Sequence, residues 1–247
     1  MMLQVESVSR TFGGLHAIKN VSFQLAEGEF LGLIGPNGAG KTTLFNCING
    51  VYPPTIGSIV FRGKPIAGLP TYKVAHLGLA RTHQIVRPLN ELSVRENVMV
   101  GACFGRYQHT KRQARRVADE VIVMVGLAGR AEQPASSLNI AQKKRLELAR
   151  ALAAEPYLLL LDEVMAALNH AEMDQVLALM NRENLYRLNL EKIAFRMKDK
   201  SFFQAVTKLL RERHVYQNTL WSYAVAHNTR GTPLKNQGVL SEVNEGW

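Results

Sequence analysis

A glycine-rich segment, Gly35-Pro36-Asn37-Gly38-Ala39-Gly40-Lys41-Thr42-Thr43, has the residue types and spacing of a phosphate-binding loop. Its glycines allow backbone N–H groups to approach an anion closely. An apolar run, Phe30–Ile34, precedes the segment and a helical pattern follows it, so the loop should connect a buried strand to a helix. The helix dipole and Lys41 would neutralise the phosphates, and the Thr42 hydroxyl would hold Mg²⁺.

Two carboxylates follow a second apolar run, Leu158–Leu161. This pattern places Asp162 and Glu163 at the carboxyl end of a buried parallel strand, which is the edge where ligands bind in open α/β sheets. Asp162 would hold Mg²⁺, directly or through water, and Glu163 would polarise an attacking water molecule. Together with the phosphate loop, the two acids predict a site that hydrolyses a nucleoside triphosphate.

The composition sets the broad class of the protein. A chain of 247 residues, 47% of them hydrophobic, is long enough for one or two domains with a sizeable core. The formal net charge of +10 favours an anionic partner such as nucleotide phosphates, nucleic acid or an acidic membrane surface. Two cysteines, Cys47 and Cys103, argue against a disulfide framework, and no apolar run reaches the ~18 residues that span a bilayer. These features predict a basic cytoplasmic α/β protein.

The elements expected around the motifs change along the chain. Short strands are predicted at Leu3–Val8 and Val21–Leu25, and a hairpin is predicted around Gly63. Beyond residue 70 the pattern is mostly helical, with helices expected at Tyr72–Leu77, Val94–Val100, Lys111–Val125 and Gln142–Ala154. From about Asn181 onward the chain is richer in aromatic and basic residues.

The order of four motifs resembles that of a known family. The phosphate loop comes first, then Gln84 after a strand, then Leu138–Gln142 at the start of a helix, and last the apolar strand with its two acids. The chain resembles the ATP-binding subunits of ABC transporters, and among them the ATPases of branched-chain amino-acid importers. The supporting segments are Arg10–Ala17, Ile34–Cys47, Gly78–Gln84, Leu92–Val98, Lys144–Leu152 and Ala166–Asn169.

The resemblance covers about residues 1–180 and implies an α/β fold. It implies a P-loop NTPase core of the RecA-like type, with an N-terminal antiparallel β region and a helical subdomain at about 88–155. Residues 1–180 would form the ATP-binding domain, and residues 181–247 a divergent C-terminal segment of uncertain fold. That segment could be an insertion, a substituted domain or a disrupted end.

The resemblance also implies roles for single residues, with ATP and Mg²⁺ as cofactors. Phe12 would stack on adenine, and Gln84 would sense both Mg²⁺ and the attacking water. The signature segment would contact the γ-phosphate bound by the opposite subunit; its residues are Leu138, Asn139, Ile140, Ala141 and Gln142. Ile140 and Ala141 stand at the family's usual glycines. Ala141 adds a methyl group where the backbone should approach phosphate, but a helical conformation tolerates a single methyl because only a positive φ demands glycine.

The tail departs further from the family pattern. A strand that ends in a histidine is expected some 30–35 residues after Glu163, yet residues 194–198 contain no histidine. The remaining candidates are His214 and His227, and the apolar-rich run Thr219–Ala226 predicts a strand directly before His227. On this pattern His227 would contact the γ-phosphate and orient the water.

The function implied is ATP-driven import of branched-chain or other hydrophobic amino acids. The expected partners are transmembrane permease subunits, a second ATP-binding subunit as homo- or heterodimer, and a substrate-binding protein. The chain would lie peripherally on the cytoplasmic face of the plasma membrane, and no nucleic-acid partner is expected. Two alternatives stay open: a hydrolysis-impaired nucleotide-binding subunit, and a soluble ABC-type ATPase that acts on nucleic acid.

Overall fold

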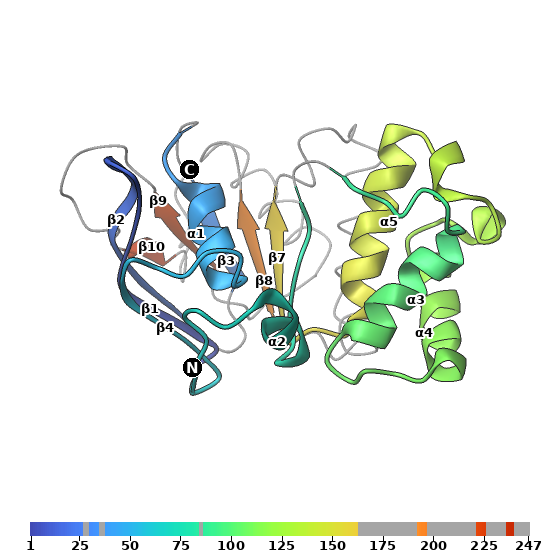
Figure 1. Cartoon of the computed structure of the whole chain (residues 1–247), viewed down its shortest axis with the longest axis horizontal. Helices are drawn as coiled ribbons and strands as arrows, with labels where there is room; N and C mark the ends of the chain where they lie inside the picture. The colour runs from blue at the N-terminus through green and yellow to red at the C-terminus, as the bar shows by residue number, and fades with distance from the viewer. Residues whose placement is uncertain are drawn as a thin grey trace, which may run out of the picture. The chain divides into compact units, whose positions relative to one another are not determined.

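The chain folds as two units, one formed by Met1–Val74 with the strands from Lys192 onward, the other lying within Ala75–Glu191. The computed structural model describes residues 1–26, 30–34, 38–83, 86–162, 192–196, 221–225 and 236–239 (Figure 1). The short helix α2 (Thr71–His76) contains the division between the units.

An antiparallel sheet opens the first unit. Its strands are β1 (Leu3–Phe12), β2 (Leu15–Leu25), β4 (Ile56–Phe61) and β5 (Lys64–Pro65), in the order β2-β1-β4-β5. Leu3 pairs with both Leu25 and Phe61, and all three side chains are buried. The sheet confirms the predicted N-terminal antiparallel region and the hairpin around Gly63.

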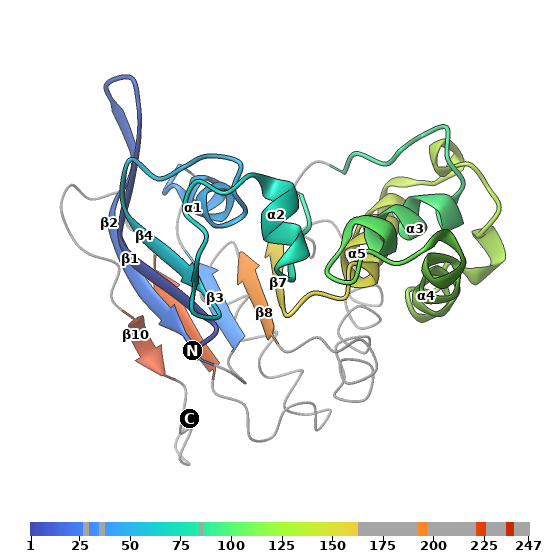
Figure 2. The ribbon, with the colours of Figure 1, turned by 60° about the horizontal axis from the view of Figure 1, so that its bottom comes forward.

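A second set of strands in this unit surrounds β3 (Phe30–Ile34), the strand that leads to the phosphate loop. β8 (Lys192–Arg196) pairs with β3 in parallel, and Figure 2 shows the two strands side by side. β9 (Trp221–Val225) also pairs with β3 in parallel, and β10 (Asn236–Val239) pairs antiparallel with β9. Helix α1 (Lys41–Ile48) follows β3 and buries Leu44, Phe45 and Ile48. The parallel pairing gives the α/β character that the sequence predicts.

The second unit combines a pair of parallel strands with a group of helices. β6 (Leu79–Arg81) pairs with β7 (Leu158–Asp162), whose five residues are all buried. The helices are α3 (Val94–Phe104), α4 (Lys111–Met124) and α5 (Ile140–Ala153), with 3₁₀ turns at Ala128–Arg130 and Ala135–Ser137. They pack together as one group (Figure 1).

Helices α3 and α5 cross at close range because glycines lie at the crossing. A Cβ atom on Gly101 would lie 2.1 Å from the carbonyl oxygen of Arg150. A Cβ atom on Gly105 would lie 2.5 Å from the Cα atom of Ala154. Any larger residue at either position would therefore force the two backbones apart.

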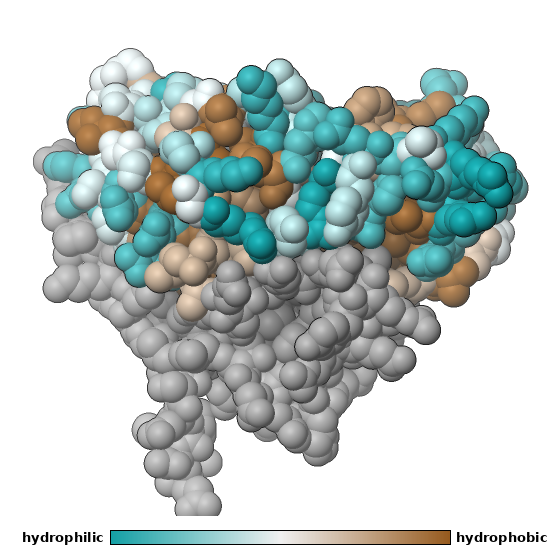
Figure 3. Space-filling model, turned by 90° about the horizontal axis from the view of Figure 1, so that it is seen from below, coloured by the Kyte–Doolittle hydropathy of each residue, from teal (hydrophilic) through white to brown (hydrophobic). Residues whose placement is uncertain are grey.

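The described surface is mixed in polarity. Figure 3 shows hydrophilic side chains over much of the described part of one face, with smaller hydrophobic areas between them. Among the residues described, no helix combines the length and the apolar character needed to cross a bilayer.

Candidate functional site

The phosphate loop has the backbone geometry that its sequence predicts where the structure describes it, from Gly38 to Thr43. Gly38 and Gly40 have φ angles of 81° and 83°, in the left-handed region that favours glycine. A Cβ atom on Gly40 would lie 2.4 Å from the carbonyl oxygen of Ala17 on β2. Glycine is therefore required at position 40 for two reasons: the positive φ angle, and the lack of space for a Cβ atom beside Ala17. Gly35, Pro36 and Asn37 lie outside the described residues.

Lys41 is the first residue of α1 and its side chain is buried, with 4% of its surface exposed. The first turn of α1 contains no acidic residue. The exposed N–H groups at a helix start and the positive end of its dipole already favour an anion there. A lysine ammonium adds to the same positive field, so this end of α1 suits a phosphate chain, and the adjacent Thr42 and Thr43 supply hydroxyl groups.

Phe12 ends β1 beside the Gly13-Gly14 turn, and 38% of its surface is exposed. Its ring meets the ring of Tyr52 edge-on, with centroids 5.2 Å apart. The Arg10 guanidinium carbon lies 4.6 Å from the Phe12 centroid. These contacts hold a partly exposed aromatic ring at the end of β1.

Asp162 lies at the carboxyl end of the buried strand β7, as predicted, and it is 1% exposed. Its carboxylate oxygen Oδ2 lies 2.7 Å from Nη2 of Arg81, and both side chains are almost fully buried. Its backbone N–H donates to Thr82 Oγ1 at 3.1 Å. Sequence reasoning missed the pairing with Arg81, although Arg81 lies in the segment that ends at Gln84. Glu163 lies outside the described residues.

Mg²⁺ prefers oxygen ligands. Within its own unit, Thr42 has a hydroxyl group directly after the glycine loop, and Asp162 has a carboxylate at the end of a buried strand, so each side chain offers an oxygen of the kind that Mg²⁺ binds. Gln84, the third predicted ligand, lies outside the described residues.

The segment before Gln84 is held by hydrogen bonds to two elements. Thr82 is fully buried and its N–H donates to the Leu160 carbonyl of β7 at 3.0 Å. The N–H of His83 donates to Oε1 of Glu147 on α5 at 2.6 Å. Burial raises the pKa of Glu147 to about 7, and burial, helped by Arg81, lowers the pKa of His83. Glu147 was not identified from the sequence.

The signature segment forms the start of α5. Asn139 is the N-cap residue: its side chain accepts from the Gln142 N–H at 2.9 Å, and the Gln142 side chain accepts from the Asn139 N–H at 3.1 Å. This reciprocal capping box fixes where the helix begins. Leu138 is buried, whereas Ile140 is 74% exposed. Neither Ile140 nor Ala141 has a positive φ, so both residues are compatible with the local helical backbone.

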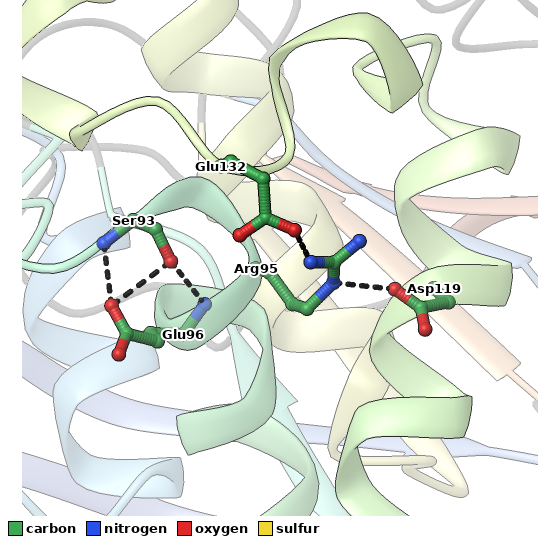
Figure 4. Close-up of polar contacts among 5 residues, drawn as sticks. All are labelled: Ser93, Arg95, Glu96, Asp119 and Glu132. Carbon is green, nitrogen blue, oxygen red and sulfur yellow. Dashed lines mark hydrogen bonds and ion pairs between the residues drawn. The ribbon is translucent and has the colours of Figure 1, made fainter.

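The loop before the signature is anchored to α3 and α4. Arg95 of α3 forms ion pairs with Glu132 of this loop and with Asp119 of α4, the latter with Nε–Oδ1 at 2.6 Å (Figure 4). A second capping box, between Ser93 and Glu96, starts α3 beside it. These contacts position the backbone that leads to the N-terminus of α5.

The strands β8 and β9 lie in the part of the sequence where the catalytic histidine is predicted. β9 (Trp221–Val225) lies within the strand predicted at Thr219–Ala226. β8 (Lys192–Arg196) lies where the family pattern expects a strand that ends in histidine. His227, which follows β9 in sequence, lies outside the described residues.

The buried Arg81–Asp162 pair makes a testable contribution to stability. We expect Arg81→Met to lower the free energy of unfolding by about 3–5 kcal/mol, because it leaves a buried carboxylate without this cation. Urea denaturation of the two proteins measures the difference. Arg130→Met, at an exposed arginine hydrogen-bonded to Gln133, is the control and should change stability by no more than about 0.5 kcal/mol. Equal losses in the two variants would contradict this account of the pair.

Comparison with known proteins agrees with this geometry. The family described as ABC transporter matches residues 18–166. The chain is 39% identical over 207 residues to the high-affinity branched-chain amino acid transport ATP-binding protein LivG of Salmonella typhimurium, a match that covers 77% of this chain and 81% of LivG. It is 38% identical over 192 residues to the corresponding protein BraF of Pseudomonas aeruginosa, with 72% and 75% covered.

Solved structures show the same fold. A bacterial ABC transporter cassette determined as a dimer superposes with a TM-score of 0.75 at 23% identity, covering 91% of this chain and 95% of the cassette. A second solved structure, of an ATP-binding subunit of an ABC transporter, gives a TM-score of 0.76 at 22% identity and covers 97% and 90%. The phosphate loop, the strand that ends at Asp162 and the capped signature helix agree with these matches. The chain belongs to the ABC transporter family, as one of its ATP-binding cassettes.

Proposed function

We propose that this chain is the ATP-hydrolysing subunit that powers import of branched-chain or other hydrophobic amino acids. The relatives LivG and BraF, named as branched-chain amino acid transport proteins, support this substrate class. The observation that carries the proposal is the start of α1, where Gly40 has its required conformation and Lys41 is buried at a positive helix end. The names of these relatives do not favour either a nucleic-acid ATPase or a hydrolysis-impaired subunit.

The proposed ATP site assigns each residue a role. The loop Gly35-Pro36-Asn37-Gly38-Ala39-Gly40-Lys41-Thr42-Thr43 wraps the phosphates and Phe12 stacks on adenine. Thr42, Asp162 and Gln84 would hold Mg²⁺, which would supply positive charge to offset that of the phosphates. Glu163 polarises the attacking water, while Gln84 and His227 orient it and the γ-phosphate.

Two such chains, or this chain and a paralogue, would complete each site. The signature residues Leu138–Gln142 of one subunit would approach the γ-phosphate bound by the other, with the N-terminus of α5 directed at the phosphate. ATP closes the pair and hydrolysis opens it again. The difference in ATP affinity between the closed and open states supplies the work of transport. The same proposal places the chain peripherally on the cytoplasmic face of the membrane, against permease subunits served by a substrate-binding protein.

Reconstitution tests this function. The chain, its permease subunits and the cognate binding protein are placed in liposomes, and uptake of labelled leucine, isoleucine and valine is measured with and without internal ATP. We expect uptake that depends on ATP and turnover that rises with loaded binding protein. A turnover that instead rises with duplex DNA and falls steeply with salt would favour the nucleic-acid alternative.

A further inference from the structure

A buried glutamate connects the signature helix to the loop that carries Gln84. Glu147 lies on α5 about two turns beyond Ile140, and only 4% of its surface is exposed. Its Oε1 atom accepts the backbone N–H of His83 at 2.6 Å. His83 is the residue directly before Gln84, so this hydrogen bond fixes the backbone at the point where the glutamine loop begins.

Further contacts of this segment lead to a different element. The Arg81 side chain pairs with the Asp162 carboxylate, and Thr82 forms backbone and hydroxyl contacts with the end of β7. These bonds attach the segment to the strand that carries Asp162. The bond from His83 to Glu147 attaches it to α5, the helix that begins at the signature.

We propose that Glu147 is a positioning residue for Gln84, holding the glutamine loop in register with the signature helix. The proposal rests on the function proposed above, in which Gln84 and the signature serve the same reaction. Movement of α5 toward a phosphate would then displace the backbone beside Gln84 through one short hydrogen bond. Glu147 itself does not touch substrate.

The property required of residue 147 is a hydrogen-bond acceptor at the end of a long side chain. A carboxylate oxygen on a buried side chain such as that of Glu147 makes a short, strong bond when it accepts a backbone N–H. Loss of the acceptor leaves the His83 N–H without this partner, which loosens the local backbone. A glutamine has nearly the same shape and keeps an acceptor oxygen, whereas a leucine of similar size has none.

A pair of uncharged variants isolates this property. In Glu147→Leu we expect the His83 amide to exchange hydrogen about 10- to 100-fold faster than in the wild type, since it has lost a strong hydrogen bond. In Glu147→Gln the exchange should remain close to wild type. Amide exchange resolved at residue 83 provides the measurement, and the amides of α1 in the other unit serve as the internal reference for folding.

Kinetics tests the link to Gln84. We expect kcat of Glu147→Leu to fall by about 10-fold or more with little change in KM for ATP, and Glu147→Gln to restore most of the loss. The same two substitutions at Glu120, an exposed glutamate on α4, are the matched control and should leave both parameters unchanged. If Glu147→Leu does not fold, Glu147→Asp withdraws the acceptor by one methylene and should behave as predicted for leucine.

The outcomes separate this inference from the proposed function. If Gln84→Ala leaves turnover unchanged, the role proposed for Gln84 fails. If Gln84→Ala lowers turnover but Glu147→Leu does not, the coupling fails alone. Fast exchange at His83 in Glu147→Gln as well as in Glu147→Leu would also overturn the proposal, because it would show that the charge and not the acceptor is required.

Discussion

Alanine at position 41 should reduce ATP turnover by about 10²- to 10³-fold or weaken ATP binding to a similar degree. The reason is the position of Lys41, a buried cation at the first residue of α1, directly after Gly40 with its left-handed backbone. Its ammonium is placed to neutralise the β- and γ-phosphates where water is largely excluded, and alanine leaves that charge uncompensated. Steady-state turnover and equilibrium binding of a fluorescent ATP analogue measure the two effects separately.

Lys111 provides a matched control for Lys41. It is likewise the first residue of a helix, α4, but it is exposed and follows Thr110, not a glycine loop. Lys111→Ala should leave turnover and ATP affinity unchanged. If Lys41→Ala behaved like Lys111→Ala, the phosphate-loop assignment would be wrong.

Glu163→Gln is expected to bind ATP but to hydrolyse it about 10²- to 10⁴-fold more slowly, the range for one positioned general base. Glutamine keeps the shape of the side chain and leaves the Asp162 carboxylate in place, but it cannot take a proton from water. ATP would therefore persist in the closed pair, and the variant should accumulate as an ATP-held dimer. Light scattering with ATP and Mg²⁺ detects the dimer, and phosphate release measures turnover.

The control for this variant is Glu120→Gln, which makes the same change on an exposed face of α4. It should hydrolyse ATP at the wild-type rate and show no additional dimer. Wild-type hydrolysis in Glu163→Gln would mean that another group activates the water.

Local sequence signals predicted most of the elements near the site. The helix after the phosphate loop, the strand β7 and the helices α3 and α4 occur where the patterns place them, each within a few residues. The capping box at Asn139 and Gln142 is itself a local signal, and it agrees with the prediction that Leu138–Gln142 opens a helix. β2 begins at Leu15, well before the predicted start at Val21. The sequence pattern did not predict this first part of the strand because its residues are largely exposed on both faces and show no alternation of buried and exposed positions.

The contacts around the glutamine loop could not be predicted in the same way. Arg81 and Asp162 are 81 residues apart in sequence, and His83 and Glu147 are 64 apart. No periodicity links residues at such distances, and a glutamate within a helical pattern is ordinarily a solvated residue. Only the packing of α5 and the end of β7 against the same short segment reveals that Arg81 and Glu147 are buried partners of the site.

The close crossing of α3 and α5 limits how these helices can move. At Gly101 and Gly105 there is no room for a methyl group between α3 and the backbone at the C-terminal end of α5, so sliding one helix along the other would bring a larger residue of the same face, such as Val98, against that backbone. A shear between the two helices is therefore costly, and the close crossing favours movement of α3 and α5 together over sliding of one along the other.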